Sequence, residues 1–149
     1  MKFNLVSTGI SLVGVTVSSL KIENGIVDIE KESKKIFGMN INEPHLEKRE
    51  GNWWSQMSID FDVKIEQAEG EICKIEMSLE GAFIVSKDID EEECKKLVGI
   101  NGAAALIGIA RGKIEAITAS VFNNGKIVIP FINVIDYYKT VRSSEEQQA

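Results

Sequence analysis

Histidine, cysteine and proline are scarce in this chain, which has 149 residues but only one histidine, two cysteines and two prolines. A lone His45 supplies neither a catalytic triad nor a histidine metal cluster. Cys73 and Cys94 stand far apart without a CxxC spacing, so neither a disulfide framework nor a zinc knuckle is predicted. We expect both cysteines to be buried free thiols, and we expect neither a metal site nor enzymatic activity.

Positive charge is also in short supply, because 17 Lys and Arg face 23 Asp and Glu, for a formal net charge of -6. No basic run is present, which argues against nucleic-acid binding. The chain lacks 18 uninterrupted apolar residues, and its first 20 residues do not read as a signal peptide. We therefore expect a bacterial cytoplasmic protein without membrane insertion.

Alternating apolar and polar residues are what the sequence does contain. They run through residues 57–65 and again through 73–85, which predicts two long strands of an antiparallel hairpin with one wet face. A further strand is expected over residues 13–22, with a bulge near Ser18 and Ser19, where the alternation shifts.

Helical signals follow the hairpin. Asp90 and Glu93 have the spacing of a capping box, and apolar residues recur every three or four positions over residues 103–121. Residues 123–125 should end this helix. Arg111 and Glu115 are expected to pair on its exposed side.

That helix has a second apolar side, which one sheet cannot cover. It is formed by Leu106, Ile109, Ala105 and Ala116. A second protein surface is therefore expected to cover it.

Candidate chemistry on the strands is weak. Asp60 and Asp62 share one strand face about 7 Å apart, which would suit an acid and base pair, but their neighbours are charged and solvated. The segment GIARGK, residues 108–113, lacks the spacing of a phosphate loop. No cofactor is expected.

The connection over residues 25–56 is long, irregular and unexpectedly apolar. It carries Phe37 and Met39, followed by the adjacent Trp53 and Trp54. Long connections are often functional, and tryptophans often anchor interfaces or cores. We expect one tryptophan in the core and the other free to line a groove.

Several of these segments resemble the SecB family of bacterial protein-export chaperones, over roughly residues 10–138. The resemblance rests on Trp53 followed by MSIDFD at 57–62, on GAF at 81–83, on Leu97 and Asn101, on LIGIAR at 106–111 with Ile114 and Thr118, and on PFIN at 130–133. Ile107, Gly108 and Ile109 stand where the family has Phe-Pro-Tyr, and Phe131 replaces its second proline.

The resemblance implies an α+β fold, with a four-stranded antiparallel sheet and helices on one face, assembled as a dimer of dimers. We expect a single domain over residues 1–141 and a polar, frayed tail over 142–149. Unfolded clients would bind in apolar grooves without ATP. The expected client site comprises Phe37, Met39, Trp53, Trp54, Ile135 and Tyr138.

Two further surfaces are expected. A subunit interface would use Leu106, Ile109, Ala105, Ala116 and Arg111, giving a dimer or tetramer. A SecA-type export motor would dock on an acidic face formed by Asp60, Asp62, Glu76 and Glu80. Two alternatives stay open: a SecB-like chaperone dedicated to one client such as an antitoxin, and a non-catalytic oligomeric adaptor.

Overall fold

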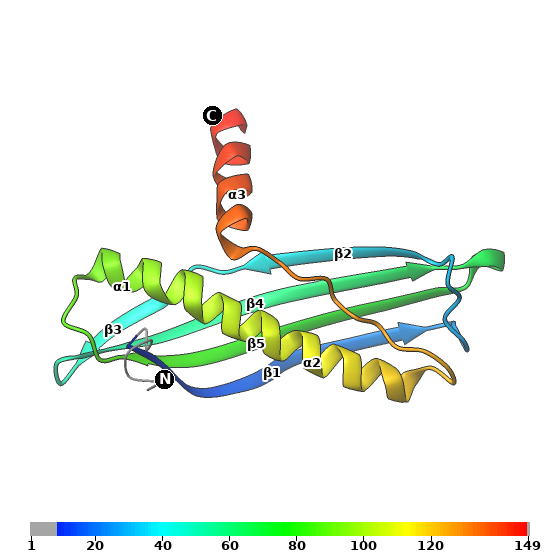
Figure 1. Cartoon of the computed structure of the whole chain (residues 1–149), viewed down its shortest axis with the longest axis horizontal. Coiled ribbons are helices and arrows are strands. Elements are labelled where there is room, and N and C mark those ends of the chain that lie inside the picture. The colour runs from blue at the N-terminus through cyan, green and yellow to red at the C-terminus, as the bar shows by residue number, and fades with distance from the viewer. Residues whose placement is uncertain (1–8, 149) are drawn as a thin grey trace, which may run out of the picture.

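The computed structural model describes residues 9–148. Residues 1–8 and 149, to which the expected domain and tail extend, lie outside that range. The described chain forms an antiparallel sheet with a helical layer on one face, so the expected α+β class is confirmed (Figure 1).

The sheet contains five strands in four positions. They are β1 (Ile10–Asn24), β2 (Lys34–Ile41), β3 (His45–Arg49), β4 (Asn52–Glu66) and β5 (Ile72–Val85). Their order is β1-β5-β4-β2, and β3 pairs with the same strand, β4, as β2 does. The position beside β4 is thus shared by two short strands, β3 along its first half and β2 along its second half. Both strands come from the connection that was expected to be irregular.

Alternation decides which face each strand residue takes. In β4 and β5 every second residue is buried against the helices, while residues of the other parity lie on the opposite, open face. The register of β1 against β5 shifts between Val17 and Ser19, as predicted, and also between Leu12 and Gly14. A short turn, η2 (Ala68–Gly70), joins β4 to β5.

The helical layer is one run of residues from Glu91 to Val121. It comprises α1 (Glu91–Leu97), the π-helical turn η3 (Val98–Gly102) and α2 (Ala103–Val121). The predicted cap is present, because the carboxylate of Asp90 accepts a hydrogen bond from the Glu93 amide at 2.8 Å. Of residues 123–125 only Gly125 has a positive φ; the helix ends where Phe122 becomes extended.

Gly81 allows α2 to approach the sheet. A Cβ at this position would lie 2.7 Å from a methyl carbon of Leu106. Leu106 is itself fully buried, together with Phe83 and the inward residues of β4 and β5. By length and composition the run Glu91–Val121 would also suffice to cross a membrane, a criterion that core helices meet as well; here one side of it covers the sheet.

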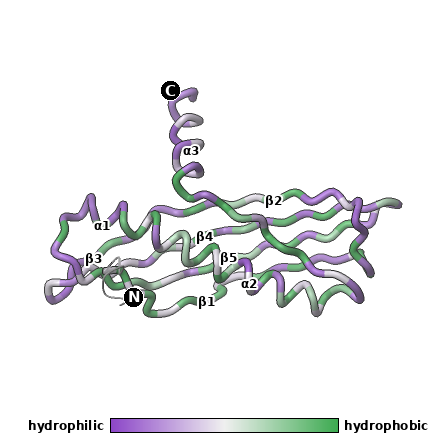
Figure 2. Tube along the Cα trace, in the orientation of Figure 1, coloured by the Kyte–Doolittle hydropathy of each residue, from purple (hydrophilic) through white to green (hydrophobic). Residues whose placement is uncertain are grey.

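Helix α3 (Val134–Gln148) stands away from this body (Figure 1). Only Val134 is buried, and hydrophilic residues dominate its outer turns (Figure 2). Residues 142–148, expected to be frayed, continue the helix. The Ser143 and Ser144 hydroxyls there donate to carbonyls one turn back, which satisfies them within the helix.

Candidate functional site

The segment that joins α2 to α3, residues 122–133, forms a strap across the helical side of the sheet (Figure 1). Its start is tied to the loop after β1, since the Asn123 amide donates to the Val27 carbonyl at 2.8 Å. Further on, Ile127 and Ile129 are buried in the core. The strap therefore has a fixed inner side and an exposed outer side.

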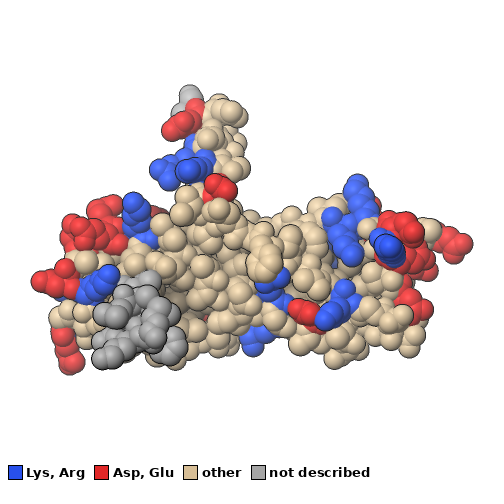
Figure 3. All heavy atoms as spheres, viewed as in Figure 1, with Lys and Arg blue, Asp and Glu red and all other residues tan. Residues whose placement is uncertain are grey.

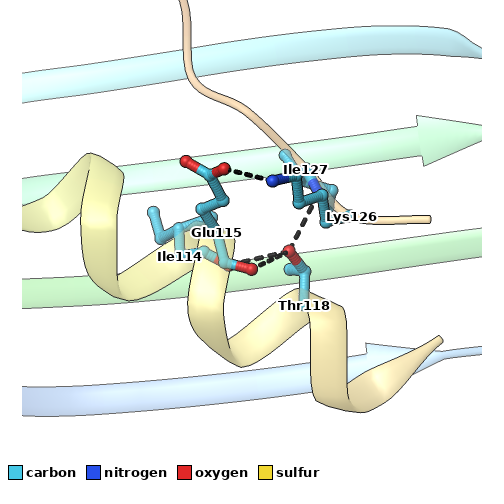
Figure 4. A network of polar contacts seen from close by, with 5 residues as sticks. All are labelled: Ile114, Glu115, Thr118, Lys126 and Ile127. Carbon is cyan, nitrogen blue, oxygen red and sulfur yellow. Dashed lines mark hydrogen bonds and ion pairs between the residues drawn. The ribbon is translucent and has the colours of Figure 1, made fainter.

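Thr118 of α2 holds the strap from below. Its hydroxyl donates to the Ile114 carbonyl at 2.7 Å and accepts from the Ile127 amide at 2.8 Å (Figure 4). All three residues are buried, so this hydroxyl provides the hydrogen bond that the Ile127 amide would otherwise lack.

Two charged residues of α2 also fasten the strap. The Arg111 guanidinium donates to the Ile129 carbonyl at 2.8 Å and lies 4.1 Å from the centre of the Phe131 ring. Glu115 pairs with Lys126, which lowers the pKa of the Glu115 carboxyl. The expected Arg111–Glu115 pair is therefore wrong, because each partner meets a closer group on the strap.

Beside the strap lies an apolar hollow of about 310 Å³. Its floor comes from β2 and β4 and its wall from the strap and the first turns of α3. The lining residues are Phe37, Gly38, Met39, Phe61, Asp62, Val63, Ile129, Pro130, Ile132 and Tyr137. Asp62 directs its carboxylate to the open face of the sheet, so it borders the hollow through its main chain. Apart from the Tyr137 hydroxyl, the side chains that line the hollow are apolar, which suits an aliphatic or aromatic group.

Tyr137 closes one end of the hollow. Its hydroxyl accepts a hydrogen bond from the Ile41 amide at 3.0 Å and lies 3.4 Å from the Asn40 side-chain oxygen. The neighbouring Tyr138 points elsewhere and donates to the Gly99 carbonyl at 2.8 Å. Burial raises the pKa of Tyr138, which keeps it a donor.

The structure brings together only part of the expected client site. Phe37 and Met39 line the hollow, whereas Ile135 and Tyr138 do not. The expected client site did not include the other lining residues, which are Phe61 and Val63 of the predicted strand 57–65, and Ile129, Pro130, Ile132 and Tyr137. In the sequence, the apolar residues Ile129 and Phe131 on either side of Pro130 could have indicated that this segment forms part of an apolar site.

Trp53 and Trp54 lie away from the hollow. Trp53 is eight residues before Phe61 on β4, which corresponds to about 27 Å along the strand. Its indole donates to the Ile89 carbonyl at 3.0 Å and so fixes the link between β5 and α1. Trp54 points to the opposite face, where the Arg49 guanidinium lies 5.6 Å from its ring. The two tryptophans thus diverge as expected, but neither shares a groove with Phe37.

The second apolar side of α2 is narrower than expected. Leu106 is in the core, and Arg111 is engaged with the strap. Ala105 and Ala116 are exposed, and Ile109 is half-buried. The outer surface of α2 therefore consists mainly of small residues.

The four acidic residues do share the open face of the sheet. Asp62 and Glu76 are direct neighbours across β4 and β5, and Asp60 and Glu80 lie on the same side. The hydroxyl of Ser78 donates to Asp60 at 2.6 Å, which, with a weaker bond from Asn42, lowers the pKa of Asp60.

A second hollow, of about 500 Å³, lies on this open face and is lined in part by His45, Glu43 and Glu80. Glu43 is paired with Lys95. Within residues 9–148 no three His, Cys, Asp or Glu residues are placed to hold a metal ion. Cys73 and Cys94 are free and buried, and burial raises the pKa of both thiols.

Comparison with known proteins gives a result for the fold. Neither protein-family models nor curated proteins match the sequence. Among solved structures, the SecB-like chaperone Rv1957 of Mycobacterium tuberculosis, in complex with a ChAD peptide from the Rv1956 HigA1 antitoxin, matches with a TM-score of 0.60. The match covers 86% of this chain and 94% of that one, at 10% identity. The chain therefore has a SecB-like fold.

Proposed function

We propose that this chain is a cytoplasmic holdase chaperone that binds unfolded polypeptides without ATP. The observation that carries the proposal is the apolar hollow between β2 and the strap, which is open to solvent along Phe37. Exposed apolar surface in a groove is typical of sites that accept another polypeptide. The similarity to a chaperone structure that contains a peptide supports the same reading.

The hollow suits moderate affinity and low specificity. Burial of apolar area contributes about 25 cal/mol per Å², but ordering an unfolded client cancels much of that gain. Several such hollows on one assembly would hold one client through multivalency. We therefore propose that self-association through the outer surface of α2 is part of the function.

Adjacent residues of β2 provide the test. Phe37 and Ile36 are similarly exposed, at 36% and 42%, but they point to the helical and open faces respectively. We expect Phe37→Ser to weaken suppression of the aggregation of a reduced, denatured protein by severalfold. Ile36→Ser, the matched control, should leave it unchanged. Equal effects of the two substitutions would remove the hollow from the site.

A dedicated-client chaperone is the second candidate, because the structural neighbour holds an antitoxin peptide. In that case one polypeptide should outcompete generic denatured proteins by orders of magnitude. Competition between peptides tiled across proteins encoded beside this chain and a generic unfolded client would separate the two candidates.

The acidic open face is the proposed docking surface for a partner such as a SecA-type motor. Asp62 and Glu76 supply like charges directly opposite each other, which a cationic partner would stabilise. Such binding would weaken steeply with added salt.

A further inference from the structure

The outer edge of β2 pairs with no other strand among residues 9–148. Asn42 donates inward to the Ser58 carbonyl of β4 at 3.0 Å, whereas the Ile41 amide donates outward to Tyr137. Successive strand residues alternate in this direction. The amides and carbonyls of Lys35, Phe37 and Met39 therefore point away from β4, and within the described part of the chain they meet no other strand.

The same residues direct their side chains into the hollow. Phe37 is opposite Val63 and Met39 opposite Phe61, both of which face the helices. A strand added beside β2 would consequently place every second side chain over the hollow, against the strap residues Ile129 and Pro130. Main-chain bonding and side-chain burial thus coincide at one edge.

Both ends of this edge are blocked. Lys34 and Lys35 lie at the start of β2, and lysines are typical of edges that must not pair indiscriminately. At the other end the Ile41 amide already donates its hydrogen bond to the Tyr137 hydroxyl, so it is not available to an added strand. Between them the surface carries no charged side chain in the view of Figure 3. The stretch from Lys35 to Ile41 is about 20 Å long.

We propose that a client docks here as an extended strand that pairs with β2 and inserts alternate apolar side chains into the hollow. This inference rests on the proposed function and specifies the conformation of the bound segment. The occupant is a short stretch of unfolded polypeptide with apolar residues at every second position. Main-chain pairing makes the binding tolerant of sequence, and the hollow selects for the alternation.

A second copy of the chain fits this edge poorly. Stable interfaces bury roughly 1,600 Å² in total. The eight residues of β2 end in two lysines on one side and at the base of α3 on the other (Figure 1). A hollow of about 310 Å³ accommodates a few side chains of a peptide, which is the scale of one strand.

A capped, fluorescently labelled heptapeptide with leucines at alternate positions and serines between them tests the proposal on the unaltered protein. Two derivatives are compared, one N-methylated at the leucines and one at the serines. N-methylation removes the amide donors of one edge of the strand only. We expect one derivative to bind about tenfold or more weakly and the other to bind like the parent. Loss with the leucine derivative indicates antiparallel pairing, and loss with the serine derivative indicates parallel pairing.

Substitutions at Met39 give an independent test. Met39→Pro removes the outward amide, a change that edge strands tolerate, whereas Met39→Ala removes only the side chain. We expect the proline variant to bind the parent peptide several times more weakly than the alanine variant, with equal helix content by circular dichroism. A change in native mass without a change in peptide binding would assign the edge to another copy and overturn the proposal.

The two proposals fail differently. If the chain suppresses aggregation but both methylated peptides bind like the parent, or no peptide binds up to millimolar concentration, strand addition is wrong and the holdase function stands. If it neither binds the parent peptide nor suppresses aggregation, the proposed function itself is wrong.

Discussion

At the scale of single residues, the Thr118 hydroxyl makes the fully buried hydrogen bond between α2 and the strap, in addition to the contacts of Arg111 and Glu115. Thr118→Val keeps the shape and leaves the buried Ile127 amide without an acceptor. We expect this to lower the free energy of unfolding by about 1–3 kcal/mol. Hydrogen exchange at the Ile127 amide should accelerate.

Thr118→Ser is the control, because serine retains the hydroxyl and loses only a methyl group. Its Ile127 amide should stay protected. Equal acceleration in both variants would mean that packing of the methyl group, and not the hydrogen bond, holds the strap.

Asp60 carries a pH dependence of its own. Hydrogen bonds from Ser78 and Asn42 lower the pKa of its carboxyl in the folded state. A depressed folded pKa contributes stability above the ordinary value near 4, and that contribution is lost as the pH falls further. We expect Asp60→Asn to reduce the urea midpoint at pH 7, and the gap from the unaltered protein to shrink at pH 3.

Asp62→Asn is the comparison for that experiment. Asp62 lies on the same face two residues along β4, and within residues 9–148 its carboxylate makes no hydrogen bond or ion pair. Its substitution removes a like charge opposite Glu76 and should therefore not lower the midpoint at pH 7. A constant gap between the Asp60 variant and the unaltered protein from pH 7 to pH 3 would contradict the assignment.

At the scale of secondary-structure elements, local pattern was sufficient where one face of a segment is buried. Residues 57–65 and 73–80 alternate apolar and polar side chains, and their strands lie at the centre of the sheet with neighbours on both sides. The helix start at Asp90 was readable because its cap is satisfied within three residues. Both patterns depend on residues close together in the chain, so they can be recognised in a single sequence.

Edge strands were harder to predict. Among the described strands, β2 and β3 pair only with β4. Their exposed residues do not alternate cleanly, so residues 25–56 were predicted to be an irregular connection. The hollow was missed for a related reason. It joins residues 37 and 39 to residues 129–137, and only the register of β2 on β4 and the path of the strap bring them together.

The polar tail was predicted from its composition alone. Residues 142–148 have few apolar side chains to bury, yet they continue α3. A helix satisfies its backbone internally, so burial is not required for the assignment. Composition alone therefore predicted the exposure of this segment and not its conformation.

At the scale of the whole molecule, the sheet and helical layer leave a surface on α2 that no other element among residues 9–148 covers. Ala105, Ile109, Gly112 and Ala116 line up along one side of the helix, because their spacing of four, three and four matches its period. Small side chains allow another backbone to approach closely. Within residues 9–148 no other element lies against Ala105 or Ala116, which are exposed.

Self-association through this surface predicts a change in mass. Ala116→Arg places a long, charged side chain where a second copy would pack, so we expect native mass measurement to shift from a dimer or tetramer to a smaller species. Ala68→Arg, at the exposed turn between β4 and β5, makes the same chemical change away from α2 and should leave the mass unaltered. Because multivalent holding depends on assembly, the Ala116 variant should also suppress aggregation less well at equal chain concentration. A monomeric unaltered protein, or an Ala116 variant of full mass, would exclude α2 as the contact and leave each hollow to act alone.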